Sequence, residues 1–336
     1  MKLIYQDIIN RIHDSTSILL HLHPSPDGDV IGSTLAMYLY LKTLGKRVTL
    51  IKGDSELPQN FHHLPGFSEI TSKTYFDLNL NEFDLFLIFD SASLSQISKL
   101  GSVSFPPHLF TIAIDHHSSN PKFARVNLVN NTVISVCEII FDMFSKSKIP
   151  ISSQMAINLF LGIYTDSGGF KYQKTTSQTF SAAAKLVKLC PDFHRYIFEL
   201  ENNADPGQIL FKGLSLSSVK LFFNNHVAIS AISYSTLKAN SLSRRHSEKS
   251  EISNTLKSVI GWDIGVSIVE YEPGICSVSL RTRDPAKYDL GLIAQAAGTG
   301  GGHPAAAGAT IYFPLDEAIQ ALLSAIQHFH PEMANS

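Results

Sequence analysis

Aspartate and histidine side chains follow several apolar segments of this 336-residue chain. The stretch HPSPDGDVIGS, residues 23–33, directly follows one such segment. Carboxylates with a minority of imidazoles, and no thiolate, favour Mn²⁺ over a structural Zn²⁺, with Mg²⁺ or Co²⁺ as substitutes. The residues of this kind at the ends of apolar segments are His23, Asp27, Asp29, Asp90, Asp115, His116, His117 and Asp166.

The segments that precede these residues read as buried strands. SILLHLH (17–23), FDLFLIFD (83–90) and LFTIAIDHH (109–117) are short, apolar and continuous, as expected for strands covered on both faces of a parallel sheet. STLAMYLYLKTLG (33–45) has a helical pattern that Gly45 ends, and RVTLIKG (47–53) again resembles a strand. The alternation predicts an α/β fold with a mainly parallel sheet.

Ligands of open parallel sheets gather at the carboxyl ends of the strands, so we expect the acidic and histidine residues to converge there. Taken alone, each aspartate is more often a helix N-cap or a loop residue, and each histidine is commonly structural. The repetition at several strand ends favours a metal site. Asp27 and Asp29 flank one glycine, which suits two ions better than one.

The number of acids indicates the chemistry of the site. Asp27, Asp29, Asp90 and Asp166 would neutralise two divalent ions and leave positions open for a hydroxide and a phosphate oxygen. Two ions about 3.5–4 Å apart are typical of two-metal phosphoester hydrolysis.

The second half of the chain predicts another domain. Helical patterns occupy residues 133–190, and strand-like segments return at 219–223, 226–233, 264–271 and 275–283. We therefore expect a domain over 1–190, a linker over 191–212, and a smaller C-terminal α/β domain over 213–336. The polar stretch SLSRRHSEKSE (241–251) is expected to be a solvated loop.

The C-terminal domain contains candidate anion-binding residues. GTGGGHPAAAGA (298–309) is too rich in glycine for a helix interior and predicts a loop whose backbone N–H groups, with His303, could bind an anion; a plain turn is the alternative. Arg281 and Arg283 end the strand-like ICSVSLRTR, and arginine is suited to bidentate phosphate recognition. The glycines are Gly298, Gly300, Gly301 and Gly302.

Composition restricts the substrate and the compartment. Lys and Arg total 27 against 29 Asp and Glu, for a net charge of −2, which does not favour binding of long duplex nucleic acid. The cysteines Cys137, Cys190 and Cys276 are too few and too widely spaced for a disulfide framework, so a reducing cytoplasm is expected. We expect no signal peptide and no membrane anchor.

Together these segments resemble a known family. HPSPDGDVIGS, the aspartate of LFLIFD, the Asp115-His116-His117 triplet and the aspartate of IYTDSGG are similar to the four motifs of the DHH phosphoesterase superfamily. SVSLRTR and GTGGGHPAAAGA resemble the associated DHHA1 domain. The length of the chain is similar to that of the nanoRNase and pAp-phosphatase group, which degrades very short RNA and dephosphorylates 3′-phosphoadenosine 5′-phosphate (pAp).

The resemblance implies a role for each site residue. His23 and Asp27 would hold one Mn²⁺, Asp29, His116 and Asp166 the other, and Asp90 would bridge the two. His117 would lie near the substrate phosphate and Asp115 would support the site from behind. The substrate-binding residues of the DHHA1 side would be Arg281, Arg283, Gly300, Gly301, Gly302 and His303, with His303 also able to protonate a leaving group.

The function expected from these observations is a cytoplasmic, Mn²⁺-dependent hydrolase of short single-stranded oligoribonucleotides with pAp phosphatase activity. Two alternatives remain open. The chain could hydrolyse linear or cyclic dinucleotide messengers such as pApA or cyclic di-AMP, or it could be a non-catalytic nucleotide sensor. A homodimer is compatible with the sequence, and neither a membrane nor a long duplex is expected as a partner.

Overall fold

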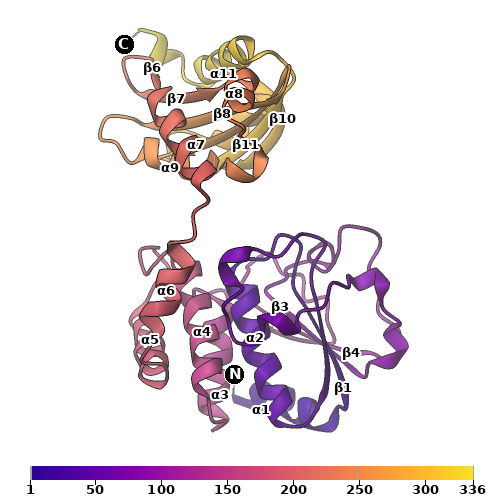
Figure 1. The fold of residues 1–336 in the computed structure, drawn as a ribbon. Helices are drawn as coiled ribbons and strands as arrows, with labels where there is room; N and C mark the ends of the chain where they lie inside the picture. Colours follow the sequence, from indigo (N-terminus) through magenta and orange to yellow (C-terminus); the bar gives the residue numbers. More distant parts are fainter. Residues whose placement is uncertain (1, 248, 336) are drawn as a thin grey trace. The chain divides into compact units, whose positions relative to one another are not determined.

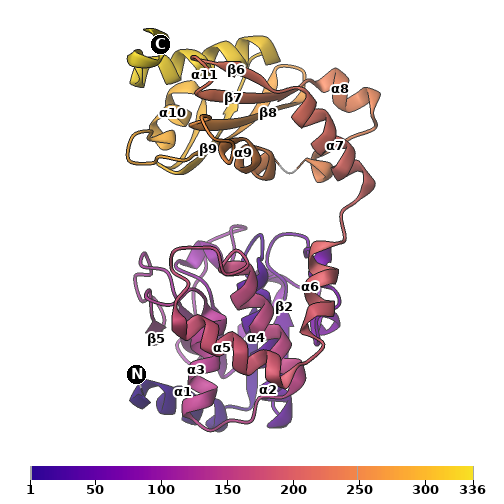
Figure 2. The same ribbon diagram turned by 90° about the vertical axis from the view of Figure 1, so that its left-hand side faces the viewer.

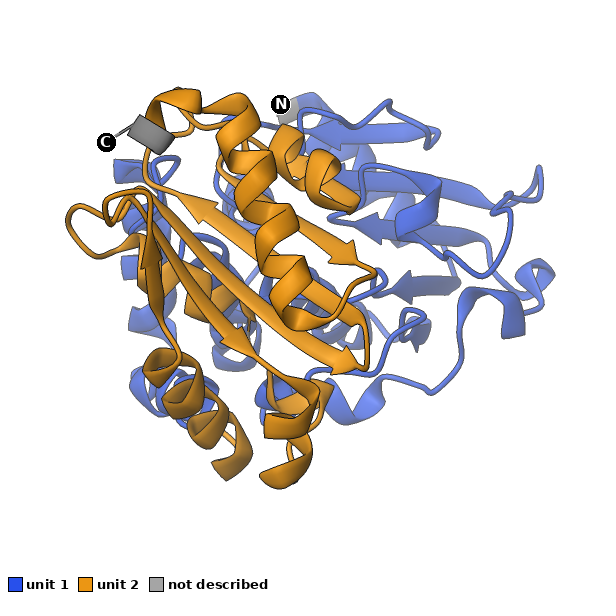
Figure 3. Cartoon of the chain, turned by 90° about the horizontal axis from the view of Figure 1, so that it is seen from above, with its two compact units in different colours: residues 1–203 blue, residues 204–336 orange. Residues whose placement is uncertain are grey.

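The computed structural model describes residues 2–247 and 249–335. The chain forms two compact units, unit 1 (Met1–Asn203) and unit 2 (Ala204–Ser336) (Figure 3). Each unit has its own sheet and its own apolar core, so each is described separately.

Unit 1 is built on a five-stranded sheet, sheet A, in the order β2-β1-β3-β4-β5 with every neighbouring pair parallel. In this order the chain leaves β1 to one side through β2 and then crosses to β3 on the other side. The carboxyl ends of β1 and β3 therefore flank the switch point at which open α/β sheets bind ligands. The strands are β1 (Ser17–His21), β2 (Arg47–Ile51), β3 (Leu85–Phe89), β4 (Phe110–Asp115) and β5 (Val126–Val129).

The helices of unit 1 form one core with one face of sheet A (Figure 1). Alternate strand residues such as Leu20, Leu87 and Ile114 face this core, whereas Leu19, Phe86 and Ala113 face a second core covered by irregular chain and short 3-10 turns. The helices are α1 (Lys2–Asp14), α2 (Gly28–Thr43), α3 (Val136–Lys146), α4 (Ser153–Asp166), α5 (Ser177–Leu189) and α6 (Phe193–Glu201), and the 3-10 turns are η1 (Gln59–Phe61), η2 (Phe67–Glu69), η3 (Tyr75–Asp77), η4 (Leu80–Glu82) and η5 (Leu94–Gln96).

The start of α2 packs closely against the end of α4. A Cβ atom at Gly28 would lie 2.2 Å from Thr165 Oγ1, so only glycine permits this approach. The close contact brings the first turn of α2, which carries Asp29, next to the last turn of α4, which carries Asp166.

Unit 2 contains a six-stranded sheet, sheet B, in the order β10-β11-β9-β8-β7-β6, in which only the β7–β8 pair is parallel. Helices α10 and α11 cover one face, and α7, α8 and α9 pack on the other (Figure 2). The elements are α7 (Pro206–Ser217), β6 (Lys220–Phe222), β7 (Val227–Ile232), α8 (Tyr234–Ala239), η6 (Arg244–His246), α9 (Lys249–Lys257), β8 (Ile264–Glu272), β9 (Ile275–Thr282), α10 (Leu290–Ala297), β10 (Thr299–His303), β11 (Ala306–Ile311), α11 (Leu315–Phe329) and η7 (Pro331–Asn335).

The α/β fold class, with its parallel N-terminal sheet and smaller C-terminal α/β domain, is confirmed. The predicted glycine loop is wrong in one respect, because residues 299–303 form the strand β10. A Cβ atom at Gly300 would lie 2.2 Å from the carbonyl oxygen of Gly308, so this glycine permits close pairing of β10 with β11.

Two other segments differ from the sequence-based description. Residues 191–212, assigned to a linker, include α6 and the first half of α7. Leu200 of α6 is buried in the core of unit 1, and Phe211 of α7 is buried in unit 2, so the helices belong to the units and the division lies between Asn203 and Ala204. The predicted solvated loop 241–251 contains η6 and the start of α9.

Among residues 2–247 and 249–335, no helix combines the length and the apolar character needed to cross a bilayer.

Candidate metal centre

The acidic and histidine residues of unit 1 lie at the carboxyl edge of sheet A. His23 and Asp27 follow β1, Asp90 directly follows β3, and His116 directly follows β4. Asp90 has a positive φ of 50°, a backbone conformation that costs energy in a residue other than glycine and is found at functional sites. This conformation occurs where β3 ends and the chain turns.

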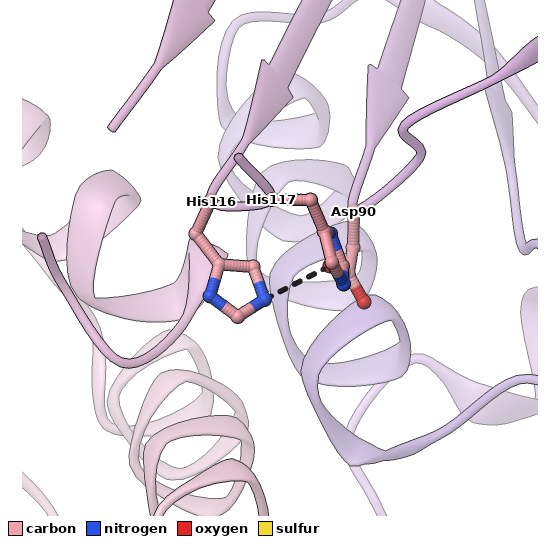
Figure 4. A group of neighbouring side chains, drawn as sticks. All are labelled: Asp90, His116 and His117. Atoms are coloured by element: carbon pink, nitrogen blue, oxygen red, sulfur yellow. Dashed lines mark ion pairs between the residues drawn. The ribbon is translucent and has the colours of Figure 1, made fainter. Parts of the chain in front are cut away.

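Asp90 lies at the centre of the cluster and is 2% exposed. Its Oδ1 atom lies 3.3 Å from His116 Nε2 and 3.4 Å from His117 Nδ1, and its Oδ2 atom lies 3.5 Å from His23 Nε2. Figure 4 shows the His116 and His117 side chains together with Asp90. His116 Nε2 is also 3.6 Å from Asp166 Oδ2, so one imidazole connects the ends of β3 and α4.

Backbone and carboxylate acceptors fix the protonated nitrogen of two histidines. His23 Nδ1 lies 3.0 Å from the Pro24 carbonyl oxygen, which can only accept, so Nδ1 carries a proton and Nε2 is the nitrogen that faces Asp90. His117 Nδ1 lies 2.8 Å from Asp115 Oδ1. A hydrogen bond from the second ring nitrogen to an oxygen is the usual arrangement for a histidine that binds a metal or a substrate.

Asp27 and Asp29 also organise the backbone around the centre. Asp27 is the N-cap of α2, and its Oδ1 atom accepts hydrogen bonds from the N–H groups of Asp29 and Val30 at 3.0 and 3.1 Å. Asp29 is 1% exposed and accepts from the N–H groups of Val136 and Cys137 at 2.6 and 2.9 Å. The N-cap interpretation is therefore correct for Asp27, and it coexists with a place in the cluster.

The carboxylates repel one another, and their pKa values reflect this. Burial, together with Asp90 and Asp166, raises the pKa of Asp29 well above its usual value. Burial also raises the pKa of Asp166, with a contribution from Asp90, to about 6. Burial alone would raise the pKa of Asp90, but the imidazoles of His116 and His23 outweigh it and hold this pKa below the usual range.

The pKa values of His116 and His117 are raised by the neighbouring carboxylates. Burial alone would lower the pKa of His116, but Asp90, Asp29 and Asp166 outweigh it and raise this pKa to about 9. The contact with Asp115 raises the pKa of His117. The centre thus gathers more negative charge than its own imidazoles neutralise, so cations would stabilise it.

The ligand atoms fit divalent ions. Three groups of side chains could each hold an ion, because within each group one ligand atom per residue lies within 4.8 Å of the others. The groups are His23, Asp27 and Asp90; Asp29, His116 and Asp166; and Asp90, His116 and His117. Two buried atoms of the cluster, Asp90 Oδ1 and His116 Nδ1, have no hydrogen-bond partner among the described residues. A buried carboxylate oxygen without a hydrogen bond is costly, and coordination to a cation would compensate for that cost.

Asp115 supports the cluster from behind and is fully buried. Its Oδ1 atom accepts from the backbone N–H of His116 at 2.8 Å and contacts His117, and its Oδ2 atom accepts from Asn120 Nδ2 at 2.6 Å. Asn120 Nδ2 also donates to the Ser91 carbonyl oxygen, next to Asp90. Asn120 is a positioning residue that the sequence analysis missed, because an asparagine in a polar loop gives no specific signal.

The predicted anion-binding residues of unit 2 lie on adjacent strands. Arg281 of β9 pairs with Ala306 of β11, which in turn pairs with His303 of β10. Arg281 and Gly301 line a pocket together with Lys249. The sequence analysis did not select Lys249 as a candidate site residue. Arg283 is exposed, and its Nη1 atom donates to the Val259 carbonyl oxygen at 2.7 Å.

Family models match both units. Residues 17–163 match the model described as "DHH family, N-terminal domain", and residues 224–330 match the model described as "DHHA1 domain". The chain is a DHH-family protein with a DHHA1 domain. The resemblance inferred from the motifs is therefore confirmed, and the two matches fall in unit 1 and unit 2, respectively.

Curated relatives span nearly the whole chain of this DHH-family protein. The bifunctional oligoribonuclease and PAP phosphatase NrnA of Thermus thermophilus is 28% identical over 315 residues, covering 92% of this chain and 89% of the relative. The NrnA protein of Bacillus subtilis, with the same description, is 26% identical over 313 residues, covering 91% of this chain and 93% of the relative.

A solved structure shares the fold. The crystal structure of an exopolyphosphatase-related protein from Bacteroides fragilis matches with a TM-score of 0.87 at 22% sequence identity. The match covers 99% of this chain and 98% of that protein. It shows the fold that both chains adopt.

Proposed function

We propose that this protein is a metal-dependent phosphoesterase that hydrolyses short oligoribonucleotides to mononucleotides and removes the 3′-phosphate of pAp. The observation that carries the proposal is the group of four aspartates and two histidines at the carboxyl edge of sheet A, with Asp90 within 3.5 Å of both His23 and His116. The relatives described as oligoribonucleases and PAP phosphatases support the choice of substrate.

We assign two Mn²⁺ ions to the cluster, one held by His23 and Asp27 and the other by Asp29, His116 and Asp166. Asp90, whose two oxygens face different histidines, would be shared. When bound, the ions would supply Lewis-acid activation of the phosphoester and of the attacking water. The mixture of carboxylates and imidazoles favours Mn²⁺, with Mg²⁺ or Co²⁺ as substitutes.

The protein's own side chains orient the substrate. His117 uses Nδ1 for Asp115, which leaves Nε2 to contact a phosphate oxygen. In unit 2 we assign phosphate binding to Arg281 and to the backbone of Gly300, Gly301 and Gly302. His303 is exposed and could protonate the leaving group, and Arg283, which is occupied by the Val259 carbonyl oxygen, would contribute least.

The near-neutral charge of −2 fits a substrate with few phosphates, since long polymers are normally bound by many Lys and Arg contacts. The three cysteines are free and buried, which agrees with a cytoplasmic location.

Initial rates with Mn²⁺ on 5′-phosphorylated RNA dimers to 24-mers, with pAp alongside, test this proposal. We expect fast loss of dimers to pentamers, little attack on the 24-mer, and release of phosphate from pAp. Hydrolysis of cyclic di-AMP or pApA alone would favour the dinucleotide-messenger alternative, and metal-dependent binding without turnover would favour a sensor.

A further inference from the structure

Unit 2 contains a pocket of about 460 Å³ beside the N-terminal end of α9. The residues that matter here are Lys249, Ser250, Ser279, Arg281, Gly301 and Gly308. Lys249 lies within the stretch that the sequence analysis assigned to a solvated loop, yet it is half-buried.

The register of sheet B explains why the pocket forms there. Ser279 of β9 pairs with Gly308 of β11, which pairs with Gly301 of β10. Helix α9 packs on β8 and on part of β9, where Ser253 bonds to Ser279, and its first turn borders the pocket. The residues of β10 and β11 that line the pocket have small side chains or none, namely Gly301, Ala306, Ala307 and Gly308.

Two cations, Lys249 and Arg281, line this pocket and bond to hydroxyl and carbonyl groups. Lys249 Nζ donates to Ser277 Oγ, and Arg281 Nη1 donates to Ser279 Oγ and to the Leu280 carbonyl oxygen. Within residues 2–247 and 249–335, neither cation forms an ion pair. Glu251, in the first turn of α9, pairs with Lys212 instead.

Among the described residues that line the pocket, the two charged side chains, Lys249 and Arg281, are both cations. Burial, and then the proximity of Arg244, lower the pKa of Lys249. Burial lowers the pKa of Arg281, and burial followed by the proximity of Arg281 lowers the pKa of Lys257. Lys249 also lies over the Tyr271 ring, 5.2 Å from its centroid. An anion would stabilise two partly buried cations whose other contacts are hydroxyl and carbonyl groups.

The two cations form hydrogen bonds with alternate residues of β9. Lys249 donates to Ser277 and Arg281 donates to Ser279, and alternate strand residues are roughly 6.6 Å apart. This spacing suits two neighbouring phosphates of one nucleotide chain better than a single phosphate.

We propose that the pocket beside α9 binds two phosphates of the substrate, with Arg281 holding one and Lys249 holding its neighbour. Lys249 then determines specificity for substrates that carry a second phosphate, such as a 5′-phosphorylated dinucleotide or pAp. This inference rests on the proposed phosphoesterase function for its substrate class, whereas its geometry depends only on unit 2.

The test compares pApA with ApA, which share one phosphodiester and differ by the 5′-phosphate. For the wild-type protein we expect kcat/KM to be at least about tenfold higher on pApA. Lys249→Gln should reduce this preference about tenfold through KM, with little change on ApA, because a charged hydrogen bond is lost while Gln can still donate to Ser277. Lys249→Arg should retain the preference, and Lys287→Gln, an exposed lysine outside the pocket, serves as the control.

Equilibrium binding of pApA in EDTA, measured by calorimetry on the full chain, separates the two proposals. If the wild-type protein hydrolyses neither dinucleotide, and Lys249→Gln binds pApA more weakly than the wild type does, the pocket is supported and the proposed function is refuted. If the wild type and Lys249→Gln both hydrolyse the dinucleotides with the same preference for pApA over ApA, the role proposed for Lys249 is wrong and the proposed function is still supported. Circular dichroism of each variant confirms that it is folded.

Discussion

The carboxyl edge of sheet A in unit 1 gathers three further aspartates around Asp90, whereas the pocket beside α9 in unit 2 presents Lys249 and Arg281, with no carboxylate among its described lining residues. In unit 1 burial and then repulsion by other carboxylates raise the pKa values of Asp29 and Asp166. In unit 2 burial lowers the pKa values of Lys249 and Arg281, and Arg244 lowers that of Lys249 further. Each site would therefore gain stability from a ligand of opposite charge, and we propose divalent cations for unit 1 and phosphates for unit 2.

The two sites also differ in how they are held. The aspartates of unit 1 are fixed by backbone N–H donors and by strand ends, and Asp29 alone accepts two hydrogen bonds from the start of α3. Lys249 and Arg281 are held by hydroxyl and carbonyl oxygens, which any bound phosphate could replace or join. Substitutions should accordingly abolish activity in unit 1 and change substrate affinity in unit 2.

The largest effect is expected for Asp90→Asn. The side chain keeps its shape but loses the charge shared between His23 and His116, so we expect activity with Mn²⁺ to fall about 10³-fold or more. Initial rates on a 5′-phosphorylated RNA dimer measure the loss, and circular dichroism checks the fold. Activity within about threefold of the wild type would show that unit 1 does not contain the catalytic centre.

Arg281→Gln should reduce kcat/KM on the same dimer about 10–100-fold, since a charged hydrogen bond contributes about 1.5–3 kcal/mol. Arg283→Gln is the matched control, and because Arg283 is exposed and bonded to Val259, its effect should stay below about threefold. Equal losses of kcat/KM in Arg281→Gln and Arg283→Gln would contradict the assignment of phosphate binding to Arg281, because Arg281 lines the pocket and Arg283 is not among its described lining residues.

A smaller loss, about tenfold, is expected for Asp115→Asn. This change weakens the contact that orients His117 while keeping an acceptor for the N–H of His116. The loss should appear in kcat, together with a lower pKa of His117 in an NMR titration, since Asp115 raises it. An unchanged His117 pKa in the variant would argue against the role given to Asp115.

The smallest effect concerns stability without metal. The pKa of Asp166 is raised from 3.8 to about 6 and that of His116 from 6.5 to about 9, so both groups bind protons more tightly in the folded state. Their contributions are present below the unfolded pKa values and are lost as pH rises, from about 4 to 6 for Asp166 and from about 6.5 to 9 for His116. In EDTA we expect the Tm to fall across pH 6.5 to 9.

Adding Mn²⁺ should oppose this trend, because metal binding requires deprotonated ligands and becomes stronger as pH rises. Calorimetric scans in EDTA and in Mn²⁺ at several pH values check both statements. A Tm in EDTA that rises between pH 6.5 and 9 would contradict the proposed electrostatics of unit 1.

The two sites were not equally visible in the sequence. The ligands of unit 1 follow continuous apolar strands, so the rule that ligands gather at carboxyl ends predicts that they lie together, as they do around Asp90. The role of Gly28, which brings α2 against α4, cannot be inferred from a single glycine without the packing of both helices.

The pocket of unit 2 depends on pairings between distant segments. Lys249 lies in a polar stretch, and only the packing of α9 on β8 and β9 brings it to Ser277. The glycines of β10 suggest a loop in the sequence because their close approach to β11 is a property of the folded sheet. The short edge strand β5 was missed as well, since VNLV includes a polar residue and is only partly buried.

The most direct test of the metal centre is anomalous scattering at the manganese edge from crystals of the protein grown with Mn²⁺. The account predicts two strong peaks in unit 1, both among His23, Asp27, Asp29, Asp90, His116 and Asp166, with Asp90 near both. A single peak there, or manganese bound elsewhere while this cluster remains empty, would contradict the two-ion assignment.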